Sequence, residues 1–407
     1  MQFLRMYQGL PKNTYILFFV QLINRLGDFV IPFLSLYLIS KLGLNTKIAG
    51  IIVTCAILSQ IPGSMAGGTI ADYWSRKKTY LISQTFSAIC ILLCAFIKNK
   101  VLIISLLLLS TFFSAAAKPL INTMIYDSME PSKREVGQSL SYLGINLGVC
   151  IGPLIAGFLF NRYLRLFFIG DAFTSLIAVM LVALRLHEMK KVERHSSNKL
   201  ISNKQFISSI VTQPKLSVFF LIYLIYCFIY AQHSFSLPLT LTNIFNSNGS
   251  IYYGYIMSIN AITVILTTAF ITYYTRKKSS LFNISLAGIF YALGFGLITI
   301  AKTFHIFVIS TILWTVGEIL ISTNSEIYVV NQSDESVRAR CCAAMLIISS
   351  IGRGTGVIAM GRYIDLFGIA SVWPFIMVLA FSASVLTRIF SFYIKKNTNS
   401  ISDHNEG

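Results

Sequence analysis

Residues 141–158 read SYLGINLGVCIGPLIAGF, which is apolar enough to lie within a lipid bilayer. Small residues recur at every fourth position of this stretch: Gly144, Gly148, Gly152 and Ala156. A spacing of four puts them on one face of a helix, where the lack of large side chains lets a second helix approach to backbone contact. Pro153 removes one helical hydrogen bond and predicts a bend.

The composition is that of a membrane protein. Of the 407 residues, 55% are hydrophobic and 12% are charged, against about 25% charged residues in a typical soluble protein. The net charge of +18 does not indicate nucleic-acid binding, because the basic residues form short clusters between apolar runs. The seven cysteines form no metal-type pair, and we expect them to act as packing residues.

Apolar runs of spanning length, roughly 20 residues each, predict an all-α polytopic membrane protein with twelve transmembrane helices. The runs lie at about residues 14–39, 47–70, 79–97, 101–126, 139–161, 166–186, 216–240, 251–274, 281–301, 304–326, 341–361 and 369–393.

The chain divides into two related parts. We expect a six-helix half at residues 1–186, a basic cytoplasmic linker at 187–214, a second six-helix half at 215–396 and a cytoplasmic tail at 397–407. The second half repeats glycines of the first at identical spacings: Gly148, Gly152 and Gly157 return as Gly352, Gly356 and Gly361. Two such halves, related by an axis along the membrane normal, predict a substrate cavity between them near the membrane midplane.

Loop charges predict the orientation. If the N-terminus is inside, the inside loops carry more than twice as many Lys and Arg residues as the outside loops. This bias places both termini in the cytoplasm.

The loop between helices two and three reads GGTIADYWSRKK at residues 67–78. Its glycines permit close helix packing, and Asp72 lies where a carboxylate can pair with Arg76 or with a helix N-terminus. A pair that forms in one conformation and breaks in another acts as a conformational latch. A plain charged turn is the alternative.

Both motifs resemble signatures of the major facilitator superfamily. The loop is similar to G-x-L-A-D-R-x-G-R-K-R at Gly68, Asp72 and Arg76, although Tyr73 and Ser75 depart from it. The resemblance implies that Asp127 is the partner of Arg76. The helix-five stretch resembles the antiporter signature, with Ala156 in place of one glycine. This implies a hinge and seal in an exporter: Gly148, Gly152, Pro153 and Gly157.

Charges within the first apolar run are the main candidates for mechanism. Arg25 and Asp28 lie one turn apart and can pair on one helix face. A neutralised structural pair is one interpretation. The other, which we favour, is that Asp28 takes up a proton and frees Arg25 to hold an anionic group of the substrate. The surrounding run, from Asn24 to Leu38, resembles prokaryotic drug-efflux members of the family.

Other polar residues at span depth are also candidates. Glu318 is the second candidate for proton coupling, although pairing with Arg353 is an equal alternative. Asp171 is expected to cap the start of helix six. The remaining candidates for the substrate cavity are Lys118, Gln232, His233 and Arg353. His233 is expected to be a hydrogen-bonded lining residue.

These features predict a secondary transporter that works by alternating access and not an enzyme. We expect proton-coupled export of an amphipathic drug or of a metabolite such as a siderophore or organic acid, by a monomer in the bacterial inner membrane. The expected partners are the substrate, the proton and the bilayer, with no nucleic acid, metal or cofactor. A symporter that imports a sugar or organic anion is the alternative, and an integral-membrane enzyme is a remote one.

Overall fold

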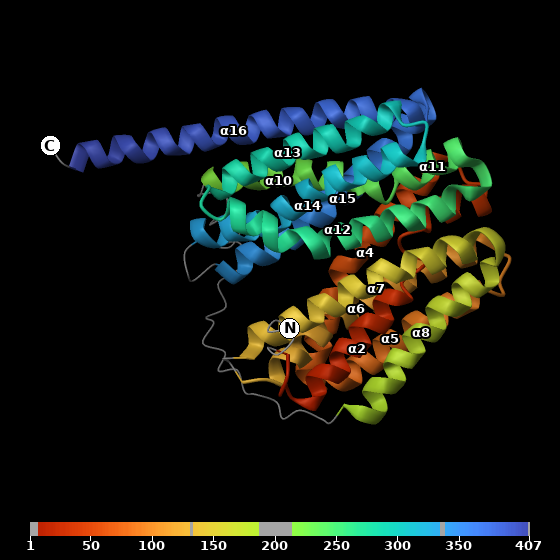
Figure 1. Ribbon diagram of the computed structural model, residues 1–407. Helices are drawn as coiled ribbons and strands as arrows, with labels where there is room; N and C mark the ends of the chain where they lie inside the picture. Colours follow the sequence, from red (N-terminus) through yellow and green to blue (C-terminus); the bar gives the residue numbers. More distant parts are fainter. Residues whose placement is uncertain (1–6, 131–132, 187–213, 334–337, 406–407) are drawn as a thin grey trace. The chain divides into compact units, whose positions relative to one another are not determined.

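The computed structural model describes residues 7–130, 133–186, 214–333 and 338–405. All regular elements in these ranges are helical (Figure 1). In chain order they are α2 (Lys12–Leu26), α3 (Leu34–Leu36), η1 (Tyr37–Lys41), α4 (Thr46–Tyr73), α5 (Arg76–Cys94), α6 (Lys100–Asp127), α7 (Arg134–Arg162), α8 (Leu164–Arg185), α10 (Pro214–Tyr230), η3 (Ala231–His233), α11 (Ser236–Phe245), η4 (Asn246–Asn248), α12 (Gly249–Thr275), α13 (Ser280–Leu297), η5 (Ile298–Ile300), α14 (Phe304–Gln332), α15 (Arg338–Phe367), η6 (Ile369–Ser371) and α16 (Val372–Asn405).

The described residues are consistent with the predicted twelve membrane-spanning segments. Within the described ranges, nine helical stretches are long and apolar enough to cross a bilayer by length and composition. One of them, Pro214–Thr275, contains two spans, because the turn η4 separates α11 from α12. The other two spans are α2 with α3 and η1, which is interrupted, and α5, which begins with three basic residues.

Contacts group the chain into two compact units. Unit 1 comprises Met1–Arg194 and Leu237–Ile265, and unit 2 comprises His195–Ser236 and Leu266–Gly407. This grouping differs from the predicted division by the segment Leu237–Ile265, which the sequence assigns to the second half. The predicted six-plus-six division is a statement about topology and stays a prediction.

The segment Leu237–Ile265 joins unit 1 because α12 packs closely on α7. The Ser250 hydroxyl donates to the carbonyl of Gly157 at 3.2 Å. Gly254 lies against the carbonyl of Pro153, where a methyl group would clash with backbone. Small residues on both helices therefore create this contact.

The core of unit 1 forms around α2, which packs on α7 and α8, while α6 packs on α4 and α5. Fully buried apolar side chains from these helices include Leu17, Val20, Tyr80 and Val182. In unit 2, α13 packs on α14 and α16, and α10 packs on α15. There the ring of Phe295 stacks on Trp314 and on Trp373.

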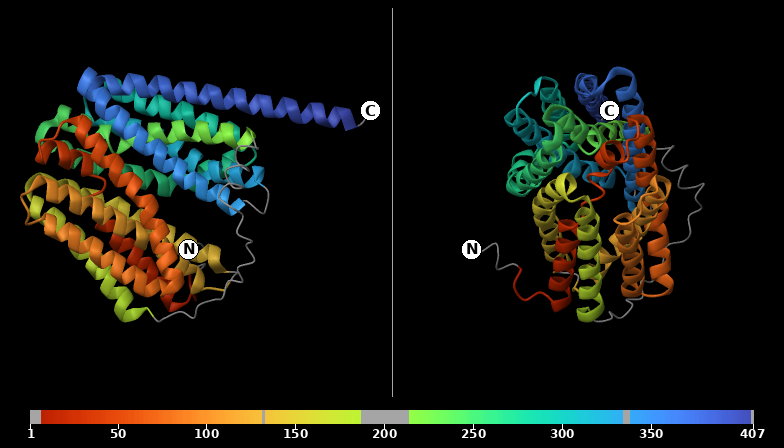
Figure 2. Two further views of the ribbon diagram at one scale, coloured as in Figure 1. Left: turned by 180° about the vertical axis from the view of Figure 1, so that it is seen from behind. Right: turned by 90° about the vertical axis from the view of Figure 1, so that its right-hand side faces the viewer.

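Unit 2 also contains the longest helix that the structure describes, α16, with 34 residues. α16 runs past its neighbours α13 and α10 in both Figure 1 and the left view of Figure 2. Its apolar part, ending at Lys395, is long enough to span a bilayer.

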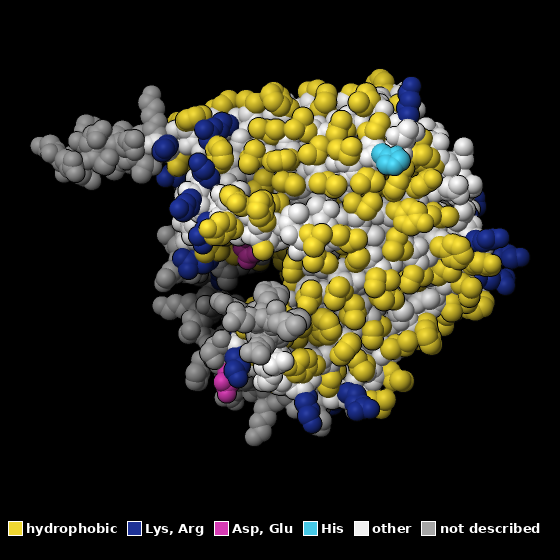
Figure 3. All heavy atoms as spheres, in the orientation of Figure 1, with side chains coloured by type: hydrophobic (Ala, Val, Ile, Leu, Met, Phe, Trp, Pro, Cys, Tyr) yellow, Lys and Arg dark blue, Asp and Glu magenta, His cyan; other side chains and the backbone are white. Residues whose placement is uncertain are grey.

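The outer surface of the helices is apolar, as a bilayer requires. Large hydrophobic side chains are widely exposed, among them Leu184, Leu221, Leu266 and Phe381. Figure 3 shows such side chains covering most of the visible face, with Lys and Arg side chains gathered towards the helix ends. In water this surface would be unfavourable, whereas lipid tails solvate it.

Candidate functional site

Helix one is interrupted, and a carboxylate holds the interruption. α2 ends at Leu26 and regular helix resumes at Leu34. In the break, the N–H groups of Phe29 and Val30 donate to Asp171 Oδ2 at 3.0 and 2.9 Å. Without an acceptor these buried donors would each cost about 1–3 kcal/mol. Asp171 therefore stabilises the broken conformation of helix one.

The sequence did not predict this role for Asp171. The expectation that Asp171 caps the start of helix six is wrong, because α8 already begins at Leu164 and Asp171 lies within it, 4% exposed. The apolar residues before Asp171 extend α8 towards its N-terminus, and the carboxylate faces the break in helix one. On the next turn of α8, Thr174 packs directly against Gly27, at the start of the break.

Arg25 and Asp28 form the predicted ion pair beside the break. Arg25 Nη1 donates to Asp28 Oδ2 at 2.9 Å. The two side chains are 30% and 23% exposed, so they are neither sealed in the core nor fully solvated. A pair in such a place is cheaper to separate than a fully buried one.

The pair lines a polar pocket within unit 1. The pocket has a volume of about 50 Å³, enough for a few water molecules. The pocket is formally neutral, because its lining contains two cations, Arg25 and Lys118, and two carboxylates, Asp28 and Asp171. Its lining comes from α2 and the following break, α5, α6 and α8: Gln21, Asn24, Arg25, Asp28, Ile31, Gln84, Ser87, Ile91, Ser110, Ser114, Lys118, Ile121, Asp171 and Ser175.

Most of this lining was missed by the sequence reasoning, although Lys118 was a predicted cavity residue. One signal was available, since Ser110, Ser114 and Lys118 recur every fourth residue and mark one polar face of α6. The amide of Gln84 donates to the Ser175 hydroxyl at 3.1 Å. Asn24 Oδ1 is buried and has no hydrogen-bond partner among the described residues. The pocket thus offers an acceptor as well as charges.

In unit 2, Glu318 lies in an aromatic setting. The Tyr230 hydroxyl donates to Glu318 Oε1 at 2.7 Å. The ring of Tyr230 packs on His233, with 4.2 Å between ring centroids, and His233 also contacts Trp314. His233 Nδ1 lies 2.6 Å from the Tyr230 carbonyl oxygen. Glu318 and His233 are therefore brought together through Tyr230.

Arg353 lies on α15, the helix that packs on α10 in the same unit. Its Nε is buried and has no hydrogen-bond partner within the described ranges. An ion pair between Arg353 and Glu318 stays a prediction.

Gln232 has a structural position that differs from the predicted one. The side chain is completely buried, so it does not line a cavity in this conformation. Its amide donates to the carbonyls of Phe228 at 3.1 Å and Gly356 at 3.2 Å, and it accepts from Ser236 at 2.7 Å. Gln232 thereby satisfies backbone groups where α10 passes into the turn η3.

The first turn of α5, directly after the loop that follows α4, makes two charged contacts. Arg76 and Asp127 form an ion pair, the one that the family resemblance implies. Lys77 donates to the carbonyls of Ala183 and Leu186 at 3.1 and 2.7 Å, and so caps the C-terminal end of α8. Asp72 also has an interaction partner, and its role as a latch stays a prediction.

Close packing of the last part of α4 on α6 depends on Gly67. A methyl group at Gly67 would clash with the backbone of Ala116 on α6, whereas one at Gly68 would meet nothing within 4 Å. The predicted contribution of Gly68 to close helix packing is therefore absent from this conformation.

The glycine face of helix five packs on helix one, as its spacing predicts. A methyl group at Gly148 would lie 2.7 Å from the Leu22 carbonyl oxygen, and one at Gly152 would lie 2.7 Å from that of Leu26. Gly157 instead faces Ser250 on α12. The proline within this helix, Pro153, does not end it, since α7 runs to Arg162. Whether these residues act as a hinge stays a prediction.

The same kind of glycine seam, a glycine face packed on the backbone of another helix, recurs in unit 2. Methyl groups at Gly352 and Gly356 of α15 would lie 2.6 and 2.7 Å from the carbonyl oxygens of Leu224 and Phe228 on α10. Each unit thus contains a broken helix seated on a glycine face.

The sequence model of the Major Facilitator Superfamily matches residues 17–357. The chain belongs to this family. It is 22% identical to a Na⁺, Li⁺, K⁺/H⁺ antiporter of Planococcus maritimus, over 91% of this chain and 94% of that protein. It is 26% identical to the quinolone resistance protein NorA of Staphylococcus aureus (strain MRSA252), over 60% of this chain and 66% of that protein.

Solved structures share the fold at low sequence identity. A POT family transporter in complex with a thioalcohol-conjugated peptide superposes with a TM-score of 0.81 at 16% identity, over 95% of this chain and 98% of that chain. The chain is therefore an integral-membrane transporter of the major facilitator superfamily and not an enzyme.

Proposed function

We propose that this transporter is a proton-coupled exporter in the cytoplasmic membrane of a bacterium. It exchanges inward movement of protons for outward movement of a small amphipathic drug or of a metabolite such as a siderophore or organic acid. The names of two relatives, a cation/proton antiporter and a quinolone resistance protein, support exchange and export. The loop charges support a cytoplasmic position for both termini.

The Arg25–Asp28 pair in the polar pocket carries this proposal. A charge at span depth costs several kcal/mol unless it is paired or reaches water, and such charges mark transport pathways. Here both conditions hold, because the pair is closed at 2.9 Å and lines a pocket with room for water. A proton on Asp28 removes the negative partner and leaves the charge of Arg25 available for an anionic group. Lys118, in the same lining, adds a second positive charge.

Glu318 is the alternative proton carrier. Its carboxylate accepts a hydrogen bond from the Tyr230 hydroxyl. A tyrosine hydroxyl can donate to a charged carboxylate or accept from a protonated one, so the contact is compatible with both protonation states of Glu318. Asp28 has the stronger claim, because its protonation also changes what Arg25 can bind. In either case release of the proton to the cytoplasm accompanies resetting of the latch formed by Asp72, Arg76 and Asp127.

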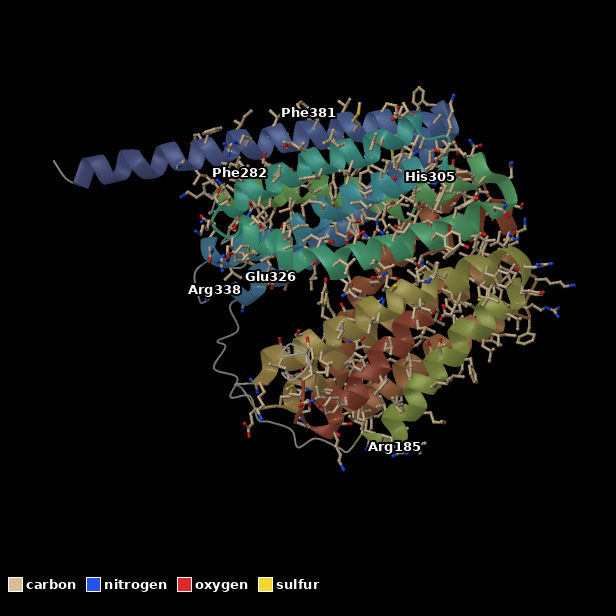
Figure 4. All side chains as sticks on the ribbon, in the orientation of Figure 1. Arg185, Phe282, His305, Glu326, Arg338 and Phe381 are labelled. Carbon is tan, nitrogen blue, oxygen red and sulfur yellow. The ribbon has the colours of Figure 1, made fainter. Side chains whose placement is uncertain are left out.

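Transport in inverted membrane vesicles with an imposed pH gradient tests the proposal. Proton release is followed while candidate drugs, siderophores and organic acids are added to wild-type, Asp28→Asn and Glu318→Gln protein. Glu326→Gln serves as the control, because this carboxylate is exposed towards the end of α14 (Figure 4). We expect substrate-dependent proton flux in wild type and control, and a loss of at least tenfold in Asp28→Asn.

The possible results separate the alternatives. Flux of wild-type size in Asp28→Asn, with loss in Glu318→Gln, moves the coupling role to Glu318 and leaves the Arg25–Asp28 pair structural. Accumulation of substrate on the same side as protons indicates a symporter that imports a sugar or organic anion. A complete lack of proton flux with every substrate, in protein that is folded, contradicts proton coupling.

A further inference from the structure

A large basic pocket lies at the end of unit 2 where α13 begins. It has a volume of about 910 Å³ and is formed by the loop before α13 together with α13, α14 and α16. Figure 4 places Phe282 at this end of α13, and Figure 3 shows Lys and Arg side chains gathered there. None of these residues belongs to the transport pathway proposed above.

The charge of the pocket is strongly positive. Five basic side chains line it, and no acidic side chain belongs to the lining that the structure describes. The five are Arg276, Lys277, Lys278, Arg388 and Lys395. Such a concentration of like charge is unfavourable in an empty site and favours an anionic ligand.

Aromatic rings hold the basic side chains over the pocket. The Arg388 guanidinium lies over the rings of Phe282 and Phe392, with 5.0 and 4.5 Å to their centroids. Lys278 Nζ lies 5.9 Å from the ring centroid of Phe282. These cation–π contacts orient two charges that originate from different elements.

Backbone and hydroxyl groups add hydrogen-bond donors. α13 has 18 residues and starts at Ser280 within the lining, so the positive end of its dipole faces the pocket. Tyr328 also belongs to the lining and is 6% exposed. Its hydroxyl is buried and has no hydrogen-bond partner in the described part of the chain. An unsatisfied buried donor at a basic pocket is a second, independent indication of an anionic ligand.

We propose that this pocket binds the phosphate group of an anionic phospholipid. Free phosphate would use only the charges, whereas part of the lining is apolar and faces outwards. Ile327 is 50% exposed and Phe392 is 59% exposed, next to the apolar part of α16. These side chains fit the glycerol and upper acyl region of a lipid whose phosphate meets Arg388 and Lys278.

Lipid binding to the purified full-length protein tests the proposal. Native mass spectrometry of detergent-solubilised protein, titrated with phosphatidylglycerol or phosphatidylethanolamine, gives apparent Kd values. The test variant is Lys278→Gln/Arg388→Gln. The matched control is Lys98→Gln/Lys100→Gln, which removes two exposed lysines in unit 1.

We expect the test variant to bind phosphatidylglycerol about tenfold more weakly than wild type, because two phosphate-facing charges are lost. The control variant and the binding of phosphatidylethanolamine should change by less than twofold. Arg388→Lys keeps the charge and should retain most of the affinity, which separates loss of charge from loss of folding. Millimolar inorganic phosphate should not displace the lipid.

Three results would overturn the proposal. Wild-type affinity for phosphatidylglycerol in the test variant would mean that the pocket does not hold the lipid. An equal loss of phosphatidylglycerol affinity in the control variant would show that the net charge of the protein, and not this pocket, determines the affinity. Displacement of the lipid by millimolar inorganic phosphate would identify a free anion as the ligand. Each readout is independent of transport and of the role of Asp28.

Discussion

The two units contain corresponding broken helices that are stabilised by different chemistry. In unit 1 the break after Leu26 is held by the carboxylate of Asp171, which accepts two backbone N–H groups. In unit 2 the break after Tyr230 is held by the amide of Gln232, which bonds the carbonyls of Phe228 and Gly356. Both breaks satisfy backbone groups that lipid cannot satisfy.

The difference lies in what each break can respond to. A carboxylate exists in two charge states, whereas an amide does not titrate. Asp171 also shares its pocket with the Arg25–Asp28 pair and Lys118, while Gln232 is enclosed by backbone and Ser236. The break in helix one is thus adjacent to several charged groups, whereas the break after Tyr230 is held by a group that does not titrate. The titratable groups near the latter are His233, which lies within η3, and Glu318, held through Tyr230.

Removal of Asp171 should have the largest effect, because its carboxylate accepts both backbone hydrogen bonds that hold the break in helix one. Asp171→Ala leaves the N–H groups of Phe29 and Val30 buried without an acceptor, at a cost of about 3 kcal/mol or more in unfolding free energy. We expect a large fall in the melting temperature of the purified protein, measured by thermal unfolding, and loss of transport. Asp171→Asn keeps one carbonyl acceptor and should be intermediate.

Ser175→Ala is the control for this prediction. Ser175 lies one turn further along α8, lines the same pocket and accepts one hydrogen bond from Gln84. Its loss should cost about 1 kcal/mol. Equal melting temperatures for Asp171→Ala and Ser175→Ala would show that the carboxylate does not hold the break.

Removal of Gln232 should have the next largest effect. Gln232→Leu keeps most of the side-chain volume but removes hydrogen bonds to Phe228, Gly356 and Ser236. Carbonyl oxygens have two lone pairs and tolerate this loss better than N–H groups, so we expect about 2 kcal/mol of destabilisation. Because an amide does not titrate, this change should leave the pH dependence of the remaining transport unaltered. A shifted pH profile in Gln232→Leu would remove the distinction between the two breaks.

The helices and the glycine seams were predictable because their signals are local. Apolar runs of spanning length and glycines at a spacing of four need no knowledge of the partner helix. The pair of Arg25 and Asp28 was predictable for the same reason, since one turn separates them. The family resemblance also pointed to the contact between Arg76 and Asp127.

The roles of Asp171 and Gln232 were not predictable, because each depends on a helix that is remote in sequence. Asp171 looked like a helix cap, since its position within α8 depends on where that helix begins. Gln232 looked like a lining residue, since nothing local shows that Gly356 brings a backbone carbonyl to its amide. Burial of a polar side chain becomes interpretable only when its partner is known.

The smallest effect concerns the glycine seams, where the two units should behave alike. Gly148→Ala places a methyl group 2.7 Å from the Leu22 carbonyl oxygen, and Gly356→Ala places one 2.7 Å from that of Phe228. Because backbone must move in both cases, we expect about 1–2 kcal/mol of destabilisation in each. Gly68→Ala is the matched control, since its methyl group meets nothing within 4 Å. Thermal unfolding of the three variants measures the difference. A stable Gly148→Ala beside an unstable Gly356→Ala would mean that α2, unlike α10, can move away from its glycine face, as a helix that takes part in the transport cycle must.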